Sequence, residues 1–400
     1  MAAARQIGRL ALGDPAVRSA VYAVPRDLVQ DVRVSGELPL GSSGGLAVRH
    51  YFPADGEYLI KIRLQRNVME EIRGLTDSHQ VDLRIDGERV KVFAVGGDRP
   101  EAGKDGISAV HTAISTYLIV ADEGLEVTLP LKAGTHAVAV TVLGQRVKPE
   151  GPFQPPITPK ATDFFTGRHT GFGVGRLEIR GPQSVGGQGD TPSRRRVFVC
   201  RPTSANGEAP CARQILSTLA RRAFRRPVTE TDVRELLASY ESGRQSGSFE
   251  TGIELALRRM LMSPYFLFRV EQDPIGVAAN APYRLADLEL AARLSFFLWS
   301  SLPDEQLLGL AVQGRLADRA VLEQQVRRML GDARSTALLT NFAGQWLEVR
   351  NLALVTPNEN IYPNFDENLR QAFKQETELF LASILREDRS VLDLLTADPS

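Results

Sequence analysis

Hydrophobic residues alternate with polar ones in the first half of the chain and follow a helical spacing in the second half, with the change near residue 190. Within residues 58–64, every second side chain is apolar and falls on one face: Tyr58, Ile60, Ile62 and Leu64. After residue 200 the spacing is three and four, as in Val233, Leu236, Leu237 and Tyr240. A period of two is typical of strands, and a period near 3.6 is typical of helices. The pattern therefore predicts an antiparallel β-sandwich followed by an all-α domain.

Residues 81–93 predict a β-hairpin, because Asp86-Gly87 is a dipeptide typical of two-residue turns that need positive φ. Pairing Ile85 with Glu88 would place apolar residues opposite one another, Leu83 with Val90 and Val81 with Val92. Further strands are expected at residues 125–129, 135–143 and 175–181.

A Gly-rich polar stretch, residues 183–195, separates the two patterns. We expect a multidomain β + α protein with a jelly-roll-like sandwich. Its expected segments are 1–39, a helical or extended remnant of an upstream segment; 40–185, the sandwich; 186–210, a linker with a Cys loop; 211–275, a helical module; and 276–400, an all-α domain. Residues 289–299 are apolar nearly all round and predict a central buried helix. No window reaches the roughly 18 apolar residues of a membrane span, and the N-terminus lacks the apolar core of a secretory signal.

The sequence RRAFRRPVTETD (221–232) raises the question of nucleic-acid binding, because it holds four arginines within six residues. Lys+Arg and Asp+Glu both total 48, so the chain carries no excess of positive charge. Cations also suit the last turn of a helix, Pro227 would stop that helix, and Thr229 with Asp232 would cap the next one. We therefore expect a structural corner between two helices and no nucleic-acid partner.

No sequence motif with a strong catalytic mechanism is present, so the choice between an enzyme and a binding protein stays open. Trp346 falls on a stripe with three other apolar residues, Leu338, Leu339 and Phe342. One interpretation is a core tryptophan. The other is a ligand cleft at a helix end, lined by Trp346, Arg350 and Asn351, in which the indole stacks on the ligand and the polar groups bind it.

Asp82 and Asp86 lie on the polar side of the predicted hairpin, with Asp55 and Glu57 as further candidates. Carboxylates near a turn can bind Ca²⁺, which prefers six to eight oxygen ligands. The alternative is a turn with ordinary surface charges. The five histidines show no metal-ligand spacing.

Cys200 and Cys211 are the two cysteines of the chain. They are either two ordinary thiols or a disulfide, which would contribute about 3 kcal/mol in an oxidising compartment. There is no C-x-x-C-H motif for attached haem.

Several long stretches, including CARQILSTLARRAFRRPVTETDV and YRLADLELAARLSFFLWSSLPDEQLL, resemble a family of large exported bacterial proteins. The family is named for planctomycetes and is built from several domains of unknown function, which often accompany a cytochrome-c-like domain. The preceding stretch RHYFPADGEYLIKIRLQR resembles calcium-dependent xylan-binding sandwiches.

The resemblance implies a periplasmic or cell-surface location, favours the Cys200–Cys211 disulfide, and implies further segments beyond both ends of the chain. The leading hypothesis is an accessory module whose sandwich binds polysaccharide. The alternatives are a redox or polysaccharide-degrading enzyme with its site near Trp346 and Arg350, and a scaffold that docks a cytochrome-c-like partner.

Overall fold

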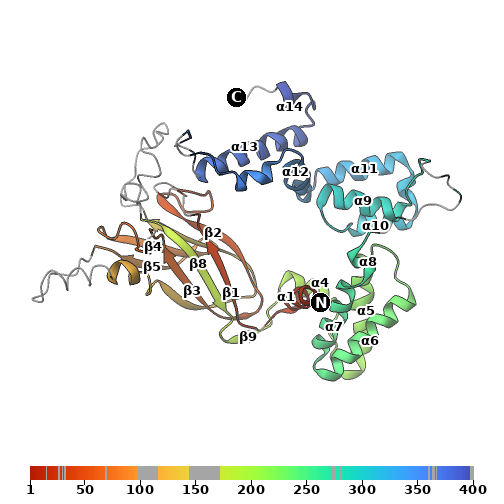
Figure 1. Ribbon diagram of the computed structural model, residues 1–400. Helices are drawn as coiled ribbons and strands as arrows, with labels where there is room; N and C mark the ends of the chain where they lie inside the picture. The colour runs from red at the N-terminus through yellow and green to blue at the C-terminus, as the bar shows by residue number, and fades with distance from the viewer. Residues whose placement is uncertain are drawn as a thin grey trace, which may run out of the picture. The chain divides into compact units, whose positions relative to one another are not determined.

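The computed structural model describes the chain except residues 15, 26–27, 29, 31–32, 68–69, 98–115, 144–171, 270, 272–275, 277, 279–280, 359–360, 363–364, 366 and 397–400. The chain forms two compact units (Figure 1). The helical unit comprises Met1–Leu12, Pro192–Ala353 and Lys374–Ser400, and the β unit comprises Gly13–Thr191 and Leu354–Phe373. His111, His169 and most of the loop expected at 144–174 lie outside the described residues.

The β unit contains two antiparallel sheets that form a sandwich, as the sequence predicted. One sheet has the strand order β1-β8-β3-β6, with β9 also paired to β3, and the other has the order β2-β7-β4-β5. The strands are β1 (Arg18–Ala23), β2 (Ser42–Phe52), β3 (Asp55–Leu64), β4 (His79–Ile85), β5 (Glu88–Val95), β6 (Glu126–Leu131), β7 (Gly134–Leu143), β8 (Val174–Gly181) and β9 (Val185–Gly187).

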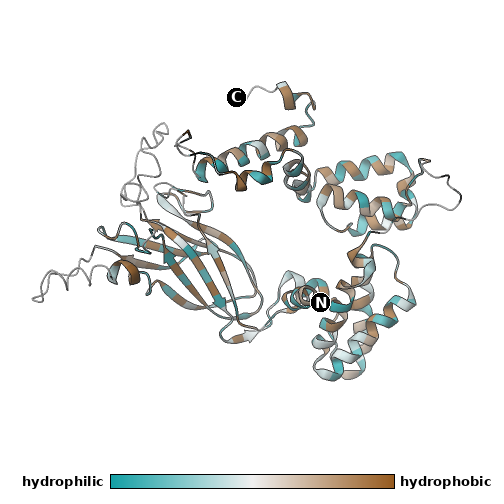
Figure 2. Cartoon of the chain, viewed as in Figure 1, coloured by the Kyte–Doolittle hydropathy of each residue, from teal (hydrophilic) through white to brown (hydrophobic). Residues whose placement is uncertain are grey.

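The period-two pattern places the core between the sheets. The side chains of Tyr58, Ile60, Ile62 and Leu64 are almost completely buried, and Figure 2 shows hydrophobic and hydrophilic residues alternating along the strands. Burial of each such side chain contributes roughly 1.5–3 kcal/mol, so the inner faces fix the register of the sheets.

The β4–β5 hairpin differs from the predicted register beyond its turn. Ile85 pairs with Glu88 as expected, but a β-bulge next to Leu83 shifts the partners by one residue. Leu83 then lies opposite Lys91, and Val81 lies opposite Phe93. The shift buries Phe93 in the core and leaves Val90 and Val92 partly exposed. The larger apolar side chain therefore gains the buried position.

The expected boundary at residue 40 also differs from the structure. β1 (Arg18–Ala23) is part of the sandwich, because it pairs with β8 over its whole length. Helix α1 (Ala2–Leu12) instead belongs to the helical unit, where Leu12 is buried and Arg9 forms an ion pair with Glu254. The segment 1–39 is thus divided between the two units.

The helical unit contains no strand among its described residues. After α1 come α4 (Pro192–Val197), α5 (Ala205–Phe224), α6 (Glu230–Ser246), α7 (Phe249–Leu261), α8 (Pro264–Leu267), α9 (Asp287–Trp299), α10 (Glu305–Val312), η1 (Arg315–Ala317), α11 (Arg319–Leu330), η2 (Ala333–Ser335), η3 (Leu338–Ala343), α12 (Gly344–Trp346), η4 (Val349–Leu354), α13 (Glu367–Arg386) and α14 (Asp393–Thr396). η4 and α13 extend across the boundaries between the units.

Two hydrophobic cores organise the helical unit. The first joins α1, α4, α5, α6 and α7, and Gly252 lets α6 and α7 approach closely, because a Cβ there would lie 2.6 Å from the ring of Tyr240. The second joins α9, α10 and α11, and in it the indole of Trp299 donates a hydrogen bond to the carbonyl of Met329 at 2.9 Å. Helix α9 is not buried all round as expected, because Phe297 on its other side is exposed.

The arginines of RRAFRRPVTETD have structural partners. Arg225 ends α5 in a left-handed conformation, and Thr229 caps α6 in a reciprocal capping box with Asp232, which confirms the predicted corner. Arg221 lies 3.4 Å from Glu305, and Arg226 pairs with Asp232. These contacts are those of a helix joint.

Candidate functional site

Trp346 is exposed at the end of α12 and stacks on Phe342 of the preceding turn. The ring centroids are 6.1 Å apart and the planes differ by 23°. The exposed fractions are 60% for Trp346 and 51% for Phe342. Trp346 is therefore not a core residue, and a cluster of large apolar side chains in water marks an interaction surface.

A π-helical turn explains why the stripe through Trp346 did not predict its exposure. η3 (Leu338–Ala343) has π-helical rather than α-helical winding, so it contains more residues per turn than an α-helix. Leu339 stays buried, but Phe342 and Trp346 rotate away from it. Such turns occur frequently at functional sites.

Phe297 extends this surface to α9. Its ring meets Phe342 edge to face, with centroids 5.8 Å apart, and 52% of the side chain is exposed. We call the three rings of Phe297, Phe342 and Trp346 the aromatic platform. The sequence did not single out Phe297, because the apolar run of 289–299 offered no reason to separate it from its buried neighbours.

Polar side chains lie along the platform. Asn341, next to Phe342, donates from its amide to the hydroxyl of Ser300 at 2.8 Å, and Arg350 donates to the amide oxygen of Asn341 at 2.6 Å. Of the two polar residues predicted for a cleft, the structure places Arg350 in this network, whereas Asn351 donates to the carboxylate of Glu348. Rings and hydrogen-bonding groups thus occur together.

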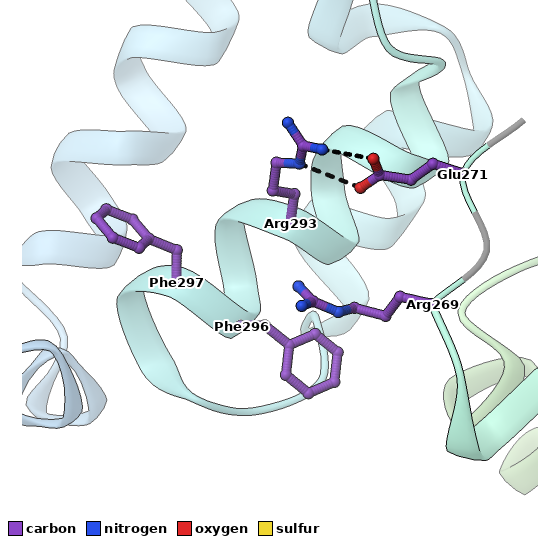
Figure 3. A pocket seen from close by; sticks show the side chains of 5 residues that line it. All are labelled: Arg269, Glu271, Arg293, Phe296 and Phe297. Carbon is purple, nitrogen blue, oxygen red and sulfur yellow. Dashed lines mark hydrogen bonds and ion pairs between the residues drawn. The ribbon is translucent and has the colours of Figure 1, made fainter. Parts of the chain in front are cut away.

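A pocket of about 490 Å³ adjoins the platform and shares Phe297 with it. Its other lining residues are Arg269, Glu271, Arg293 and Phe296. Figure 3 shows Arg293 in a double hydrogen bond with Glu271, and Arg269 directed towards Phe296. The guanidinium carbon of Arg269 lies 5.1 Å from the centroid of that ring, within the range of a cation–π contact.

Arg225 lies on the same ring, with its guanidinium carbon 5.9 Å from the centroid of Phe296. It is buried, and it donates to four backbone carbonyls, those of Ala223, Tyr265, Phe266 and Phe268. Burial, and secondly the charge of Arg269, lower the pKa of Arg225, but an arginine in this setting stays protonated. Two positively charged side chains therefore lie close to one ring.

The two carboxylates predicted to bind calcium are engaged by other groups. The buried carboxylate of Asp82 accepts from Arg84 at 2.8 Å and from Arg89 at 3.0 Å. Asp86 accepts from the backbone of Ala137 at 2.8 Å and lies 2.6 Å from a ring nitrogen of His136. Among the described residues, no group of three or more His, Cys, Asp or Glu side chains could hold a metal ion. The geometry gives no support to a calcium site at this hairpin.

Cys200 and Cys211 form a disulfide in the structure. Cys211 lies within α5 and is buried in the first core of the helical unit, where Cys200 packs beside it. The bond thus closes the loop that leads into α5.

Two regions of the chain match family models. Residues 211–271 match the model described as PSD5, a protein of unknown function (DUF1595), and residues 285–400 match the one described as PSD4, a protein of unknown function (DUF1592). Both are planctomycete-type families. No curated protein and no solved structure matches the chain significantly.

The aromatic platform lies in the PSD4 region, and the pocket joins it to the end of the PSD5 region through Arg269 and Glu271. In the described part of the chain, no helix is long and apolar enough to span a membrane.

Proposed function

We propose that the chain is a polysaccharide-binding accessory module of an exported protein, and that the aromatic platform of the helical unit holds the glycan. The observation that carries this proposal is the exposure of the nearly parallel rings of Trp346 and Phe342. The apolar faces of sugar rings pack on exposed aromatic rings, while sugar hydroxyls need hydrogen-bonding groups beside them. Arg350 and Asn341 supply such groups at the edge of the platform.

The platform is a better glycan site than the sandwich to which the sequence assigned this role. Among the described residues of 13–191, the large apolar side chains with high exposure are aliphatic, for example Val21 and Val185. Aliphatic side chains lack the flat faces on which sugars stack. The glycan therefore belongs on the helical unit.

Binding rather than catalysis fits the groups that line the pocket. Glu271 is the carboxylate among them, and Arg293 already neutralises it through two hydrogen bonds. A general acid or base must reach a proton of the substrate, and both carboxylate oxygens of Glu271 already accept from Arg293. Export agrees with the Cys200–Cys211 disulfide, because such bonds persist in oxidising compartments. A cytochrome-c-like partner stays a prediction.

Binding of the full chain to a panel of soluble polysaccharides, measured by affinity electrophoresis and titration calorimetry, tests the proposal. We expect Trp346→Ala to weaken binding by about tenfold or more, and Trp346→Phe to retain most of it, because a ring remains. Leu395→Ala, at an exposed apolar residue of α14, is the matched control. Wild-type affinity in the Trp346→Ala variant, or no binding of the wild type to any glycan, would overturn the proposal.

A further inference from the structure

We infer that the pocket beside the platform selects acidic glycans, and that Arg269 binds the carboxylate or sulfate group of a sugar. The inference rests on the proposed glycan binding and adds the class of sugar. Its structural basis is continuity, because Phe297 both lines the pocket and contacts Phe342 of the platform. A chain that lies on the platform can therefore place a neighbouring sugar in the pocket.

The charges of the lining residues do not cancel. Two arginines and one glutamate line the pocket, which leaves a net charge of +1. Arg293 and Glu271 neutralise each other through their double hydrogen bond, so the excess belongs to Arg269. Among the described residues, the exposed guanidinium of Arg269 contacts the ring of Phe296. Its N–H groups are therefore able to bind an anion.

Arg225 strengthens the positive potential without competing for the ligand. Its guanidinium donates to four backbone carbonyls, which hold it in place 5.9 Å from the centroid of Phe296. Its charge is therefore not cancelled by a carboxylate within those contacts. An anion bound at Arg269 would offset the repulsion between the guanidinium groups of Arg225 and Arg269, which lie 5.9 and 5.1 Å from the centroid of Phe296.

The pocket has the size and the chemistry for one acidic sugar. Its volume of about 490 Å³ lies within the range of small-molecule sites. The planar fork of Arg269 can donate two parallel hydrogen bonds to a carboxylate or a sulfate group. Phe296 and Phe297 offer apolar surface to the body of the sugar.

Matched pairs of polymers test the inference, with calorimetry on the full chain at low salt. Polygalacturonate is compared with its methyl ester, and dextran sulfate with dextran, so that the carboxylate and sulfate arms are separate. We expect at least one acidic polymer to bind about tenfold more tightly than its neutral partner. Arg269→Gln should abolish that difference, because it removes the group that binds the anion.

Control variants distinguish the possible failures. Arg319→Gln removes an exposed arginine of α11 and should leave the preference for acid intact. An equal loss in both arginine variants would show unspecific charge attraction and would overturn the inference. Equal binding of acidic and neutral polymers would also overturn the inference. If that binding still depends on Trp346, the proposed function is retained. If the wild type binds no glycan at all, the proposed function itself is wrong.

Discussion

The guanidinium group of Arg226 donates two hydrogen bonds to the carboxylate of Asp232, at 2.8 and 3.0 Å. The same carboxylate accepts from the backbone N–H of Thr229 at 2.8 Å and so completes the cap of α6. Arg226 also lies over the ring of Tyr265 in α8, with its guanidinium carbon 4.5 Å from the centroid. The pair of Asp232 and Arg226 thus links the cap of α6 to α8, and Arg226 holds the pKa of Asp232 well below its usual range.

Asp232→Ala should lower the free energy of unfolding by about 2 kcal/mol, because it removes the cap and leaves Arg226 without its carboxylate. Circular dichroism at 222 nm during urea unfolding measures the loss. Glu230→Gln is the control, because its ion pair with Arg213 is exposed and should contribute less than about 1 kcal/mol. Equal effects of the two variants would contradict the structural role of Asp232.

The β unit should lose stability between pH 6.5 and 4 through His50. Burial lowers the pKa of His50 from 6.5 to about 4, and the hydroxyl of Tyr22 lies 2.8 Å from the Nδ1 of the ring. A depressed histidine pKa means that the unfolded chain binds more protons in this window, so stability falls as the pH falls. Because the ring is only partly buried, we expect a loss of about 1–2 kcal/mol.

Tryptophan fluorescence would not report on the β unit, because both tryptophans, Trp299 and Trp346, lie in the helical unit. Hydrogen exchange of peptides from β1 and β2 therefore measures this loss. His50→Gln should flatten the pH dependence between 4 and 6.5. If His50→Gln keeps the pH dependence of the wild type, other groups cause the loss of stability and the assignment to His50 is wrong.

The features that the sequence predicts correctly are those that depend on residues close together along the chain. The corner at Pro227 followed from helix-terminus chemistry within a dozen residues, and the change from sandwich to helices followed from side-chain period. The register of β4 and β5 did not follow, because a bulge lets the packing of the whole sandwich choose Phe93 over Val92 as the buried residue.

The candidate site was only partly predictable. Trp346 and Arg350 stood out as residue types. The π-helical turn at 338–343, however, gives no reliable signal in a single sequence, and it exposes Phe342 and Trp346, which a regular α-helical stripe would bury. The pocket depends on Arg269 and Arg293, which only the packing of separate helices brings together.

Calcium should have no effect on the stability of the β unit. The oxygens of Asp82 accept from Arg84 and Arg89, and Ca²⁺ would have to displace both guanidinium groups to gain a ligand. Thermal unfolding in excess EGTA and in millimolar Ca²⁺ should therefore give the same midpoint. A midpoint that rises by several degrees with Ca²⁺, and that Asp82→Asn abolishes, would restore the calcium site that the sequence suggested.

Removing the Cys200–Cys211 disulfide should lower the free energy of unfolding of the helical unit by about 3 kcal/mol, given the sequence separation of 11 residues between the cysteines. Mass spectrometry of unreduced peptides establishes the linkage first. Urea unfolding of Cys200→Ser, followed by circular dichroism, then gives the loss, and reduction of the wild type should reproduce it. Quantitative alkylation of both cysteines in protein prepared under oxidising conditions would show that the bond does not form.

Arg225 should be among the most sensitive positions of the helical unit, because its buried guanidinium binds backbone carbonyls of α5 and of the α8 segment. Arg225→Ala removes these bonds and should cost about 3–4 kcal/mol in the free energy of unfolding. Arg225→Gly removes the same bonds but suits the left-handed backbone, whose φ is 57°, so it should be about 1 kcal/mol less destabilising than alanine. Arg225→Lys should fall between these variants and the wild type, because its three donors cannot reach all the carbonyls. Losses below about 1 kcal/mol in both the alanine and the glycine variants would show that the α5–α8 joint is held by apolar contacts instead.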